Sequence, residues 1–413
     1  MRGASAKRFA RQIRALMRGA SAKQFFVLTM AVAPLWLYAG VSWAEGEGGI
    51  FSWHPSLRVT GVADDNVRFE DGGGSGSLGV WVAPRVELDY RAPVFSVGAD
   101  LGVDYRYYGD EGAPVTDLLY RAVGWGEVGL GAGFRAGLSN AYVPQPLRLG
   151  RPEDDTANLV QSNRFDADVS WRRELAAGHE LAAGVVASHF LSDDYSEPVP
   201  LAGGGFAVEP DFEPTYVQGL IFTELQSPVG EHTETFIRGQ VAYRDYTELP
   251  LGDNTNLSTL VGVRSRQLGA LDFELSGGGG ALIFEDETGW RALARLAARY
   301  RFDIGLSLWA TARHLSTPDL VVEQTHQSTL EIGFEQRFGP ATALDAKIFA
   351  TRFLGDARGS GGNLFGAAEL RLRRQLTERI QAGIHYRHWR NAGSLGLDDF
   401  HQNRVALELG FRL

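Results

Sequence analysis

Arginine recurs at every second or fourth position in several segments of this chain. The clearest groups are Arg264 with Arg266, Arg371 with Arg373, and Arg291 with Arg295 and Arg299. A guanidinium group binds carboxylate and phosphate oxygens through two parallel hydrogen bonds. Several of them on one face of an element would make a surface that attracts anions. The elements that carry these arginines must therefore present them on a common face.

The residues between these arginines are apolar, which identifies the elements as strands. The segment 290–302 places Trp290, Leu296 and Tyr300 at even positions and arginines at odd ones. The last ten residues, RVALELGFRL, alternate in the same way. Because successive side chains of a strand point to opposite faces, period-two alternation predicts strands with one apolar and one polar face. Convincing helical periodicity is scarce, so the chain is predicted to be all-β.

Three features favour a membrane barrel over a soluble β-sandwich. The alternating segments are about 11–14 residues long, as a tilted membrane strand requires. The connections alternate between short ones (91–93, 176–179, 227–232, 267–270, 338–341 and 376–379) and longer ones (70–77, 143–158, 192–214, 355–362 and 391–400). Aromatic residues gather near strand ends, as in interfacial girdles. These are Tyr90, Tyr105, Tyr107, Trp171, Tyr243, Tyr246, Trp290, Tyr300, Trp389 and Phe411.

The fold expected over 56–413 is a transmembrane antiparallel up-and-down β-barrel of about 18 strands. Strand starts are predicted near 56, 78, 94, 117, 130, 162, 180, 215, 233, 255, 271, 289, 304, 327, 342, 363, 379 and 401. An even number of strands leaves both ends of the sheet on the periplasmic side, beside the short turns. The final strand is expected to pair with the first, since a closed sheet has no unpaired edge. Phe411 and the terminal Leu413 resemble the terminal strand signal that outer-membrane insertion machinery reads, although the final residue here is Leu.

The first 44 residues have the features of a secretory signal peptide. A basic segment rich in Arg and Lys precedes the apolar run at 24–41, and small residues lead to a predicted cleavage between Ala44 and Glu45. The phrase MRGASAK occurs at 1–7 and again at 17–23, which makes Met17 a candidate start. A retained transmembrane anchor is the alternative. Residues 45–55 are expected to form a short periplasmic segment before the barrel.

Twelve arginines are predicted to contact anions in the lumen. They are Arg106, Arg135, Arg238, Arg244, Arg264, Arg266, Arg291, Arg295, Arg299, Arg371, Arg373 and Arg387. Inward acids are expected mainly in the first half of the chain, whereas arginines dominate from residue 238 onward, so the wall is expected to lean positive despite a net charge of −10. The alternative is that these arginines only pair with inward acids of neighbouring strands and stiffen a polar wall.

The sequence offers little for catalysis or for a cofactor. There is no cysteine and no GxSxG motif, and no enzyme activity, cofactor or metal is predicted. The glycine-rich stretch 129–137 resembles a dinucleotide loop but is interpreted as part of a strand, because no helix follows it. His385 and His388 are expected on opposite faces of a strand. Acid pairs such as Asp64 and Asp65 are interpreted as solvated rim residues, with divalent-cation binding beside lipopolysaccharide as the alternative.

The start of the barrel region carries a resemblance to a known family. The stretch RVTGVADDNVRF at 58–69 and the Tyr- and Arg-rich strands that follow it resemble the β-barrel porins found with bacterial exopolysaccharide and capsule gene sets. The barrel is also similar in kind to the eighteen-stranded alginate exporter with its arginine-rich lumen. This resemblance implies an outer-membrane channel for a secreted polysaccharide and no catalytic residues.

The function expected from the sequence is therefore export of an anionic exopolysaccharide through an arginine-lined lumen in the outer membrane of a Gram-negative bacterium. A general or anion-selective diffusion porin for small solutes is one alternative. A non-conducting structural or adhesive barrel closed by its loops is the other. The expected partners are outer-membrane lipids and lipopolysaccharide, the barrel-insertion machinery and periplasmic polysaccharide export components, and no nucleic acid.

Overall fold

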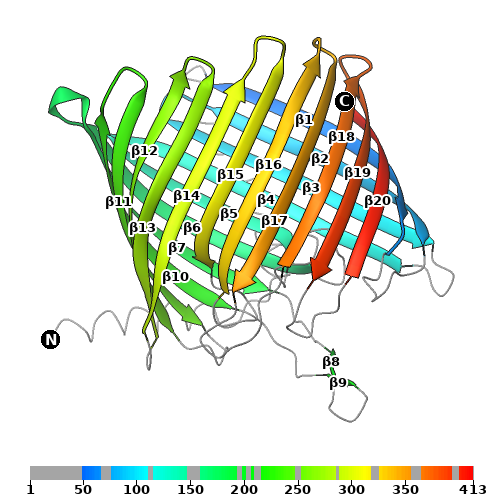
Figure 1. The fold of residues 1–413 in the computed structure, drawn as a ribbon, viewed down its shortest axis with the longest axis horizontal. Helices are drawn as coiled ribbons and strands as arrows, with labels where there is room; N and C mark the ends of the chain where they lie inside the picture. The colour runs from blue at the N-terminus through cyan, green and yellow to red at the C-terminus, as the bar shows by residue number, and fades with distance from the viewer. Residues whose placement is uncertain are drawn as a thin grey trace.

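The chain forms a closed antiparallel barrel of eighteen strands, which confirms the predicted fold and strand number. The computed structural model describes residues 49–66, 76–109, 115–146, 159–192, 198–200, 206–208, 215–246, 253–284, 288–317, 325–354, 364–392 and 400–412. Each strand pairs with the next along the chain, except that β7 pairs with β10. The ring closes where β1 pairs with β20. Strands β1–β7 lie behind β11–β20 in Figure 1, so the two halves of the chain form opposite walls.

The first half of the barrel contains eight long strands. They are β1 (Ile50–Asp64), β2 (Ser77–Arg91), β3 (Phe95–Gly109), β4 (Val115–Gly131), β5 (Phe134–Pro146), β6 (Leu159–Glu174), β7 (Glu180–Ser192) and β10 (Tyr216–Pro228). Two short strands, β8 (Pro198–Pro200) and β9 (Phe206–Val208), pair only with each other. A single 3-10 turn, η2 (Ala176–Gly178), joins β6 to β7.

The second half contributes ten strands. They are β11 (Thr233–Tyr246), β12 (Asn254–Leu268), β13 (Leu271–Ile283), β14 (Thr288–Arg301), β15 (Leu306–Thr317), β16 (Thr325–Phe338), β17 (Thr342–Leu354), β18 (Leu364–Gln375), β19 (Ile380–Ala392) and β20 (Phe400–Arg412). The short turns gather at one end of the barrel, together with the ends of β1 and β20 (Figure 1). The opposite end, which receives the longer connections, is called the outer end below.

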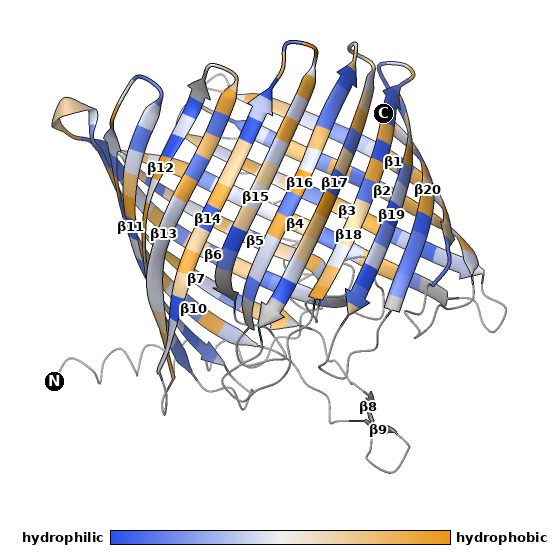
Figure 2. Cartoon of the chain, viewed as in Figure 1, coloured by the Kyte–Doolittle hydropathy of each residue, from blue (hydrophilic) through white to orange (hydrophobic). Residues whose placement is uncertain are grey.

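The predicted alternation divides the side chains between the two faces of the barrel. Ile348, Val261 and Leu407 are 66%, 56% and 59% exposed on the exterior. Residues at the positions between them point inward and are mostly polar, so hydropathy changes from residue to residue along each strand (Figure 2). An apolar exterior of this extent is stable in lipid rather than in water. The described residues contain no helix that is long and apolar enough to cross a membrane.

Three details of the strands differ from the predictions. The first strand begins at Ile50 rather than near 56, because residues 50–55 pair with β2. The stretch 129–137 is not one strand but the end of β4, a tight turn and the start of β5, since Gly131, Ala132 and Gly133 all have positive φ angles. Residues 143–146, predicted to begin a long loop, instead extend β5 and pair with β6. The rest of that loop, most of 192–214, the signal segment and Leu413 lie outside the described residues.

The wall is incompletely paired between β4 and β5 at the outer end. Their pairing stops at Ala122 and Tyr142, and the final residues of β5 pair only with β6. Pro144 lies in this unpaired part of β5, and proline has no N–H to donate to a second neighbour. The side-chain amide of Gln161 fills part of the gap, because it donates to the Tyr120 carbonyl and accepts from the Tyr120 N–H, both at 3.2 Å. A side chain thus substitutes for a missing strand neighbour.

Aromatic rings that face the lumen lie over glycines of the neighbouring strand. Trp309 is directly opposite Gly333, and Trp125 is directly opposite Gly98. A Cβ atom at Gly333 would lie 2.4 Å from the Trp309 ring, and one at Gly98 would lie 2.2 Å from the Trp125 ring. The missing side chains therefore let the rings lie flat against the wall. This arrangement gives part of the abundant glycine a packing role and keeps bulky rings away from the channel axis.

We expect Gly333→Val to destabilise the barrel by about 1–3 kcal/mol, because the new side chain displaces Trp309 from the wall. The midpoint of urea unfolding in detergent, followed by tryptophan fluorescence, measures this loss. Gly219→Val on β10 is the matched control, since a Cβ there meets nothing within 4 Å. An equal loss in both variants would show that the ring contact is not the cause.

Candidate functional site

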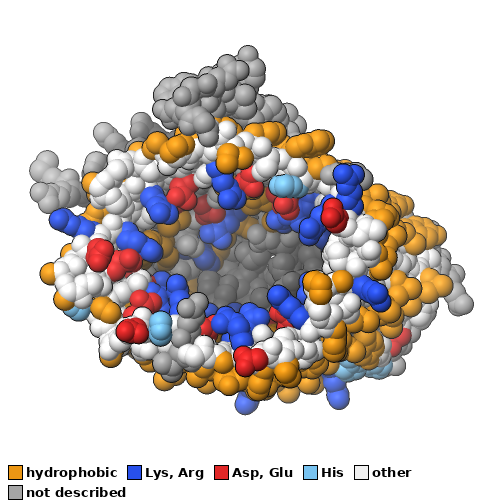
Figure 3. Space-filling view, turned by 90° about the horizontal axis from the view of Figure 1, so that it is seen from above, with side chains coloured by type: hydrophobic (Ala, Val, Ile, Leu, Met, Phe, Trp, Pro, Cys, Tyr) orange, Lys and Arg blue, Asp and Glu red, His pale blue; other side chains and the backbone are white. Residues whose placement is uncertain are grey.

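The lumen wall is the candidate site, and the register places the predicted arginines on it. Arg291, Arg295 and Arg299 have the opposite parity to Trp290, Leu296 and Tyr300, which are exposed on the exterior. The same comparison places all the other predicted contact arginines inward except Arg266. Arg266 falls within the register irregularity between Ser265 and Leu268, next to a short turn. Seen through the open mouth, arginines and acids intermingle around the hollow interior, and apolar side chains cover the outside (Figure 3).

Most of the predicted contact arginines form ion pairs with inward carboxylates. On β14, Arg295 lies 3.4 Å from Glu274 and Arg299 lies 3.3 Å from Glu335. Comparable pairs join Arg106 to Asp104, Arg135 to Glu127, Arg238 and Arg264 to Glu224, Arg371 to Glu408, and Arg373 to Asp345. The structural alternative, a wall of paired charges, therefore describes these positions. A paired arginine still presents N–H groups to the lumen, but with little net charge.

The most buried of these networks centres on an acid that the sequence analysis did not select. Glu224 on β10 is 4% exposed and pairs with both Arg238 and Arg264, while Gln226 donates to it at 2.7 Å. Arg264 also pairs with Glu234. The alternation of β10 places Glu224 opposite in phase to the exterior Ile221 and Leu225. Leu220 and Phe222 also point inward on β10. Because they are apolar, the inward positions of this strand do not form a polar pattern in the sequence.

Other inward acids were also missing from the prediction, and they bring the wall closer to electrical balance than expected. Glu127 pairs with Arg135, and Glu180 lies 3.2 Å from Arg172. Asp117 is inward as well, because it is opposite Arg106 in the β3–β4 register. All three lie on the first half of the barrel. The acids of β1–β10 thus face the arginine-rich wall of β11–β20 across the lumen.

Three of the predicted arginines make polar or aromatic contacts. Arg244 stacks 4.5 Å from the Tyr216 ring centre and donates to Gln218 at 2.7 Å. Arg387 lies 4.7 Å from the centre of the Trp389 ring. Arg291, which is 8% exposed, donates to Asn256. Cation–π contacts of this kind hold a guanidinium in place without neutralising it.

Two aromatic residues predicted for the membrane girdle point into the barrel. Tyr246 and Trp389 have the inward parity of β11 and β19, and they are 8% and 5% exposed. Tyr246 packs edge-on against Tyr216, and Trp389 stacks on Phe365 at 5.6 Å. The residue type near a strand end does not show which face a side chain lies on. A shift of one residue along the strand moves the side chain to the other face.

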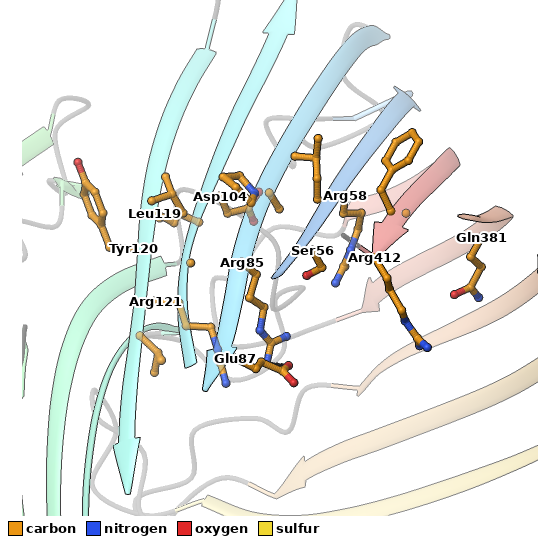
Figure 4. A pocket seen from close by; sticks show the side chains of 18 of the residues that line it. Ser56, Arg58, Arg85, Glu87, Asp104, Leu119, Tyr120, Arg121, Gln381 and Arg412 are labelled. Carbon is orange, nitrogen blue, oxygen red and sulfur yellow. Dashed lines mark ion pairs between the residues drawn. The ribbon is translucent and has the colours of Figure 1, made fainter. Parts of the chain in front are cut away.

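A recess of the wall is lined by five arginines that were not among the predicted contacts, and four of them lie on strands. We call Arg58, Arg85, Arg121 and Arg412 the basic recess (Figure 4). They come from β1, β2, β4 and β20 and line a hollow of about 460 Å³. The register between strands brings them together. Ser56 is opposite both Arg412 and Arg85, and Gly102 is opposite both Arg85 and Arg121.

The charges within the basic recess do not balance. Arg85 and Arg121 share one carboxylate, that of Asp100, at 2.7 and 2.5 Å. Glu87 adds a second acid 3.0 Å from Arg85. Within the described residues, Arg58 and Arg412 have no carboxylate within ion-pair distance. The recess therefore retains positive charge on an open, hydrated wall, which favours the entry of an anion.

Comparisons with models of known protein families and with curated protein sequences give no match. The fold is similar to solved structures. Pseudomonas aeruginosa OccK5 (OpdH) is 10% identical with a TM-score of 0.47, over 88% of this chain and 98% of that one. P. aeruginosa OccK7 (OpdD) is 10% identical with a TM-score of 0.48, over 87% and 99%. Acinetobacter baumannii OccAB4 is 11% identical with a TM-score of 0.48, over 88% and 98%. The function of this chain must be argued from its own wall.

His385 and His388 lie on opposite faces of β19, as predicted, with His385 near Glu369 in the lumen and His388 on the exterior. Over the described part of the chain, no three His, Asp or Glu residues gather as they would around a metal ion.

Proposed function

We propose that this protein is an outer-membrane diffusion channel that favours small anionic solutes. The observation that supports this best is the basic recess, where Arg58 and Arg412 have no described carboxylate partner and Arg85 and Arg121 share Asp100. An apolar exterior and a polar interior are the faces that a membrane channel requires. The short-turn end is assigned to the periplasm, since bacterial outer-membrane barrels have short turns on that side.

The recess suits solutes whose charge is carried on carboxylate or phosphate groups. Guanidinium groups from β20, β1, β2 and β4 follow one another along the wall, so an anion passing one meets the next. Many weak contacts attract an anion without trapping it. The ion pairs of Arg85 and Arg121 lower the charge of each, which keeps such contacts weak.

The opposite arrangement of acids and arginines adds an orienting field across the lumen. A solute with separated charges would turn its anionic end toward the arginines of β11–β20 or toward the basic recess, and its other end toward the acids of the remaining first-half wall. Such a wall therefore accepts zwitterions and polar anions more readily than it accepts cations.

We expect Arg58→Ser with Arg412→Ser to shift the channel toward cations. Two unit charges removed about 7 Å from the ion path raise the energy of an anion by roughly 1 kcal/mol in water and lower that of a cation by as much, which amounts to about 30-fold in the anion-to-cation permeability ratio at low salt. The reversal potential of single channels in planar bilayers under a KCl gradient measures this ratio. Arg374→Ser is the control, because Arg374 lies on the exterior face. A wild-type reversal potential in the double variant would refute the role of the recess.

Export of an anionic exopolysaccharide, the function expected from the sequence resemblance, is the second candidate. Its support is the same arginine-lined lumen together with the resemblance of residues 58–109 to polysaccharide-associated porins. Loss of secreted polysaccharide in a deletion strain would favour it, whereas loss of small-anion uptake alone would favour the diffusion channel. A barrel that carries no current in bilayers would fit neither, and would favour a structural or adhesive role.

A further inference from the structure

The exterior of the barrel changes character at the outer ends of β17, β19 and β20. Midway along these strands the outward side chains are apolar, as at Ile348, Ile384 and Leu407, which are 66%, 50% and 59% exposed. Residues of the same parity nearer the outer end are basic or polar. They are Arg352, His388, Arg390, His401 and Asn403, which we call the outer basic patch.

The height of the patch places it at the lipid head groups. Arg390 lies ten residues beyond Ile380, the first residue of β19 at the short-turn end. Ten residues at about 3.3 Å each, tilted by about 40°, rise roughly 25 Å, which is the height of the apolar band of an outer-membrane barrel. An arginine facing lipid at the middle of that band costs about 2–4 kcal/mol, and this cost falls near zero at its edge. Arg390 is therefore at a depth where it can meet the phosphate groups of a lipid.

The patch adds basic side chains to the aromatic girdle. At comparable positions on other strands the outward residues include aromatic ones, as at Tyr107 on β3 and Trp290 on β14, which are 40% and 81% exposed. Such rings form the ordinary girdle at the head-group level. On β19 the outward Tyr386 is 39% exposed and belongs to the same girdle, and His388 and Arg390 follow it toward the outer end. Exposed arginines at this level make this part of the rim suited to bind negative charge.

Space for a head group lies beside Arg390, next to small residues of β18 and β17. Arg390 is directly opposite His401 on one side and Gly366 on the other. Gly366 is in turn opposite Ala350, two residues before Arg352 on the same face of β17. Arg352 itself is directly opposite the exposed Leu364, so Leu364 borders the far side of this space. Both arginines are exposed, and the described ion pairs include neither of them.

Hydrogen bonds fix one side of the patch before any ligand binds. The Asn403 side chain accepts from the Tyr386 hydroxyl at 2.9 Å and lies 2.9 Å from Nδ1 of His388. Its amide donates to Asp65 at 2.6 Å. Among the described contacts, Asp65 is thus held by Asn403 and forms no ion pair with Arg352 or Arg390. A site held in this way loses little conformational freedom when it binds a ligand.

We propose that the outer basic patch binds the phosphate groups of lipopolysaccharide in the outer leaflet. This proposal rests on the outer-membrane placement and sidedness given above, and not on conduction. The two arginines supply planar, permanently charged donors for the lipid A phosphates, and His401 supplies a further donor beside Arg390. Exterior apolar residues below them contact the acyl chains. The lipid would thereby hold the β17–β20 wall and the β20–β1 closure together.

The test uses the full-length protein and compares two variants. One is the double variant Arg352→Gln/Arg390→Gln, and the other is the control Arg374→Gln. Arg374 is also an exposed, outward arginine, but it lies at the short-turn end of β18, on the side of the other leaflet. Native mass spectrometry in detergent, with added bisphosphorylated lipid A, measures the apparent affinity. We expect at least tenfold weaker binding for the double variant and a change of less than twofold for Arg374→Gln.

Dephosphorylated lipid A is the second probe, and we expect it to bind both variants and the wild type equally weakly. The proposal is overturned if the double variant binds bisphosphorylated lipid A like the wild type, or if Arg374→Gln loses as much. Single-channel conductance and ion selectivity should be unchanged in the double variant, since both arginines face away from the lumen. Lost lipid binding with intact conduction thus separates this proposal from the proposed channel function.

Discussion

Asp64→Ala is expected to lower the stability of the barrel by about 3 kcal/mol or more, the largest effect of any single substitution considered for this chain. Asp64 and Arg404 form a salt bridge of 2.7 Å across the β1–β20 closure, with side chains 0% and 5% exposed. Gln402 also donates to Asp64, at 2.8 Å, and the Asn66 N–H donates at 3.0 Å. Removal of the carboxylate leaves a buried guanidinium without its partner. The urea midpoint and heat-modifiable mobility of the folded protein measure the loss.

Two further variants isolate the cause of that loss. Glu127→Ala removes a comparable ion pair with Arg135 whose side chains are 51% and 69% exposed, and we expect a change of about 1 kcal/mol or less. Asp64→Ala combined with Arg404→Leu removes both buried charges and should recover at least half of the stability. If the double variant is as unstable as Asp64→Ala, an uncompensated charge is not the reason for the defect.

Serine at Arg291, Arg295 and Arg299 together is expected to abolish or reverse the anion preference of the channel. Loss of three unit charges about 7 Å from the ion path raises the energy of an anion by roughly 2 kcal/mol in water and lowers that of a cation by as much, on the order of several hundredfold in the permeability ratio at low salt. Glu274 also loses its pair with Arg295, so the wall gains a free carboxylate. Glu335 keeps Arg337 at 2.7 Å and contributes less. Reversal potentials under a KCl gradient measure the change.

The matched control for this variant is lysine at the same three positions. It preserves the charge but not the planar bidentate donors, so we expect ion selectivity near that of the wild type. Unchanged selectivity in the serine variant would mean that this wall does not govern permeation. In that case the basic recess on β20, β1, β2 and β4 would be the next part of the wall to test for anion preference.

The acids Asp64 and Asp65 show how a correct strand prediction can misplace a side chain's role. Two adjacent acids after a strand are typical of a solvated rim, and the sequence analysis interpreted them so. In the structure Asp64 is buried against Arg404, and Asp65 accepts from the Asn403 backbone and side chain, both at 2.6 Å. Their partners are more than 330 residues away in the chain. Only closure of the barrel brings them together.

The sequence by itself determined the faces of each strand and the number of strands. Side-chain direction along a strand has a strict period of two, so an exterior Leu296 guarantees inward neighbours on both sides, Arg295 among them. This local rule needs no knowledge of which strands are adjacent. It predicted that eighteen alternating segments would close with the last strand against the first, as the pairing of β20 with β1 confirms.

The tertiary structure alone decided which charges meet. Ion pairing depends on the register between strands, and a shift of one residue would exchange every partner. Register thus neutralises Arg238 with Glu224 and leaves Arg58 and Arg412 without a carboxylate among the described residues. Alternation is a property of single strands, whereas neutralisation is a property of pairs, and so the first can be read from the sequence and the second cannot.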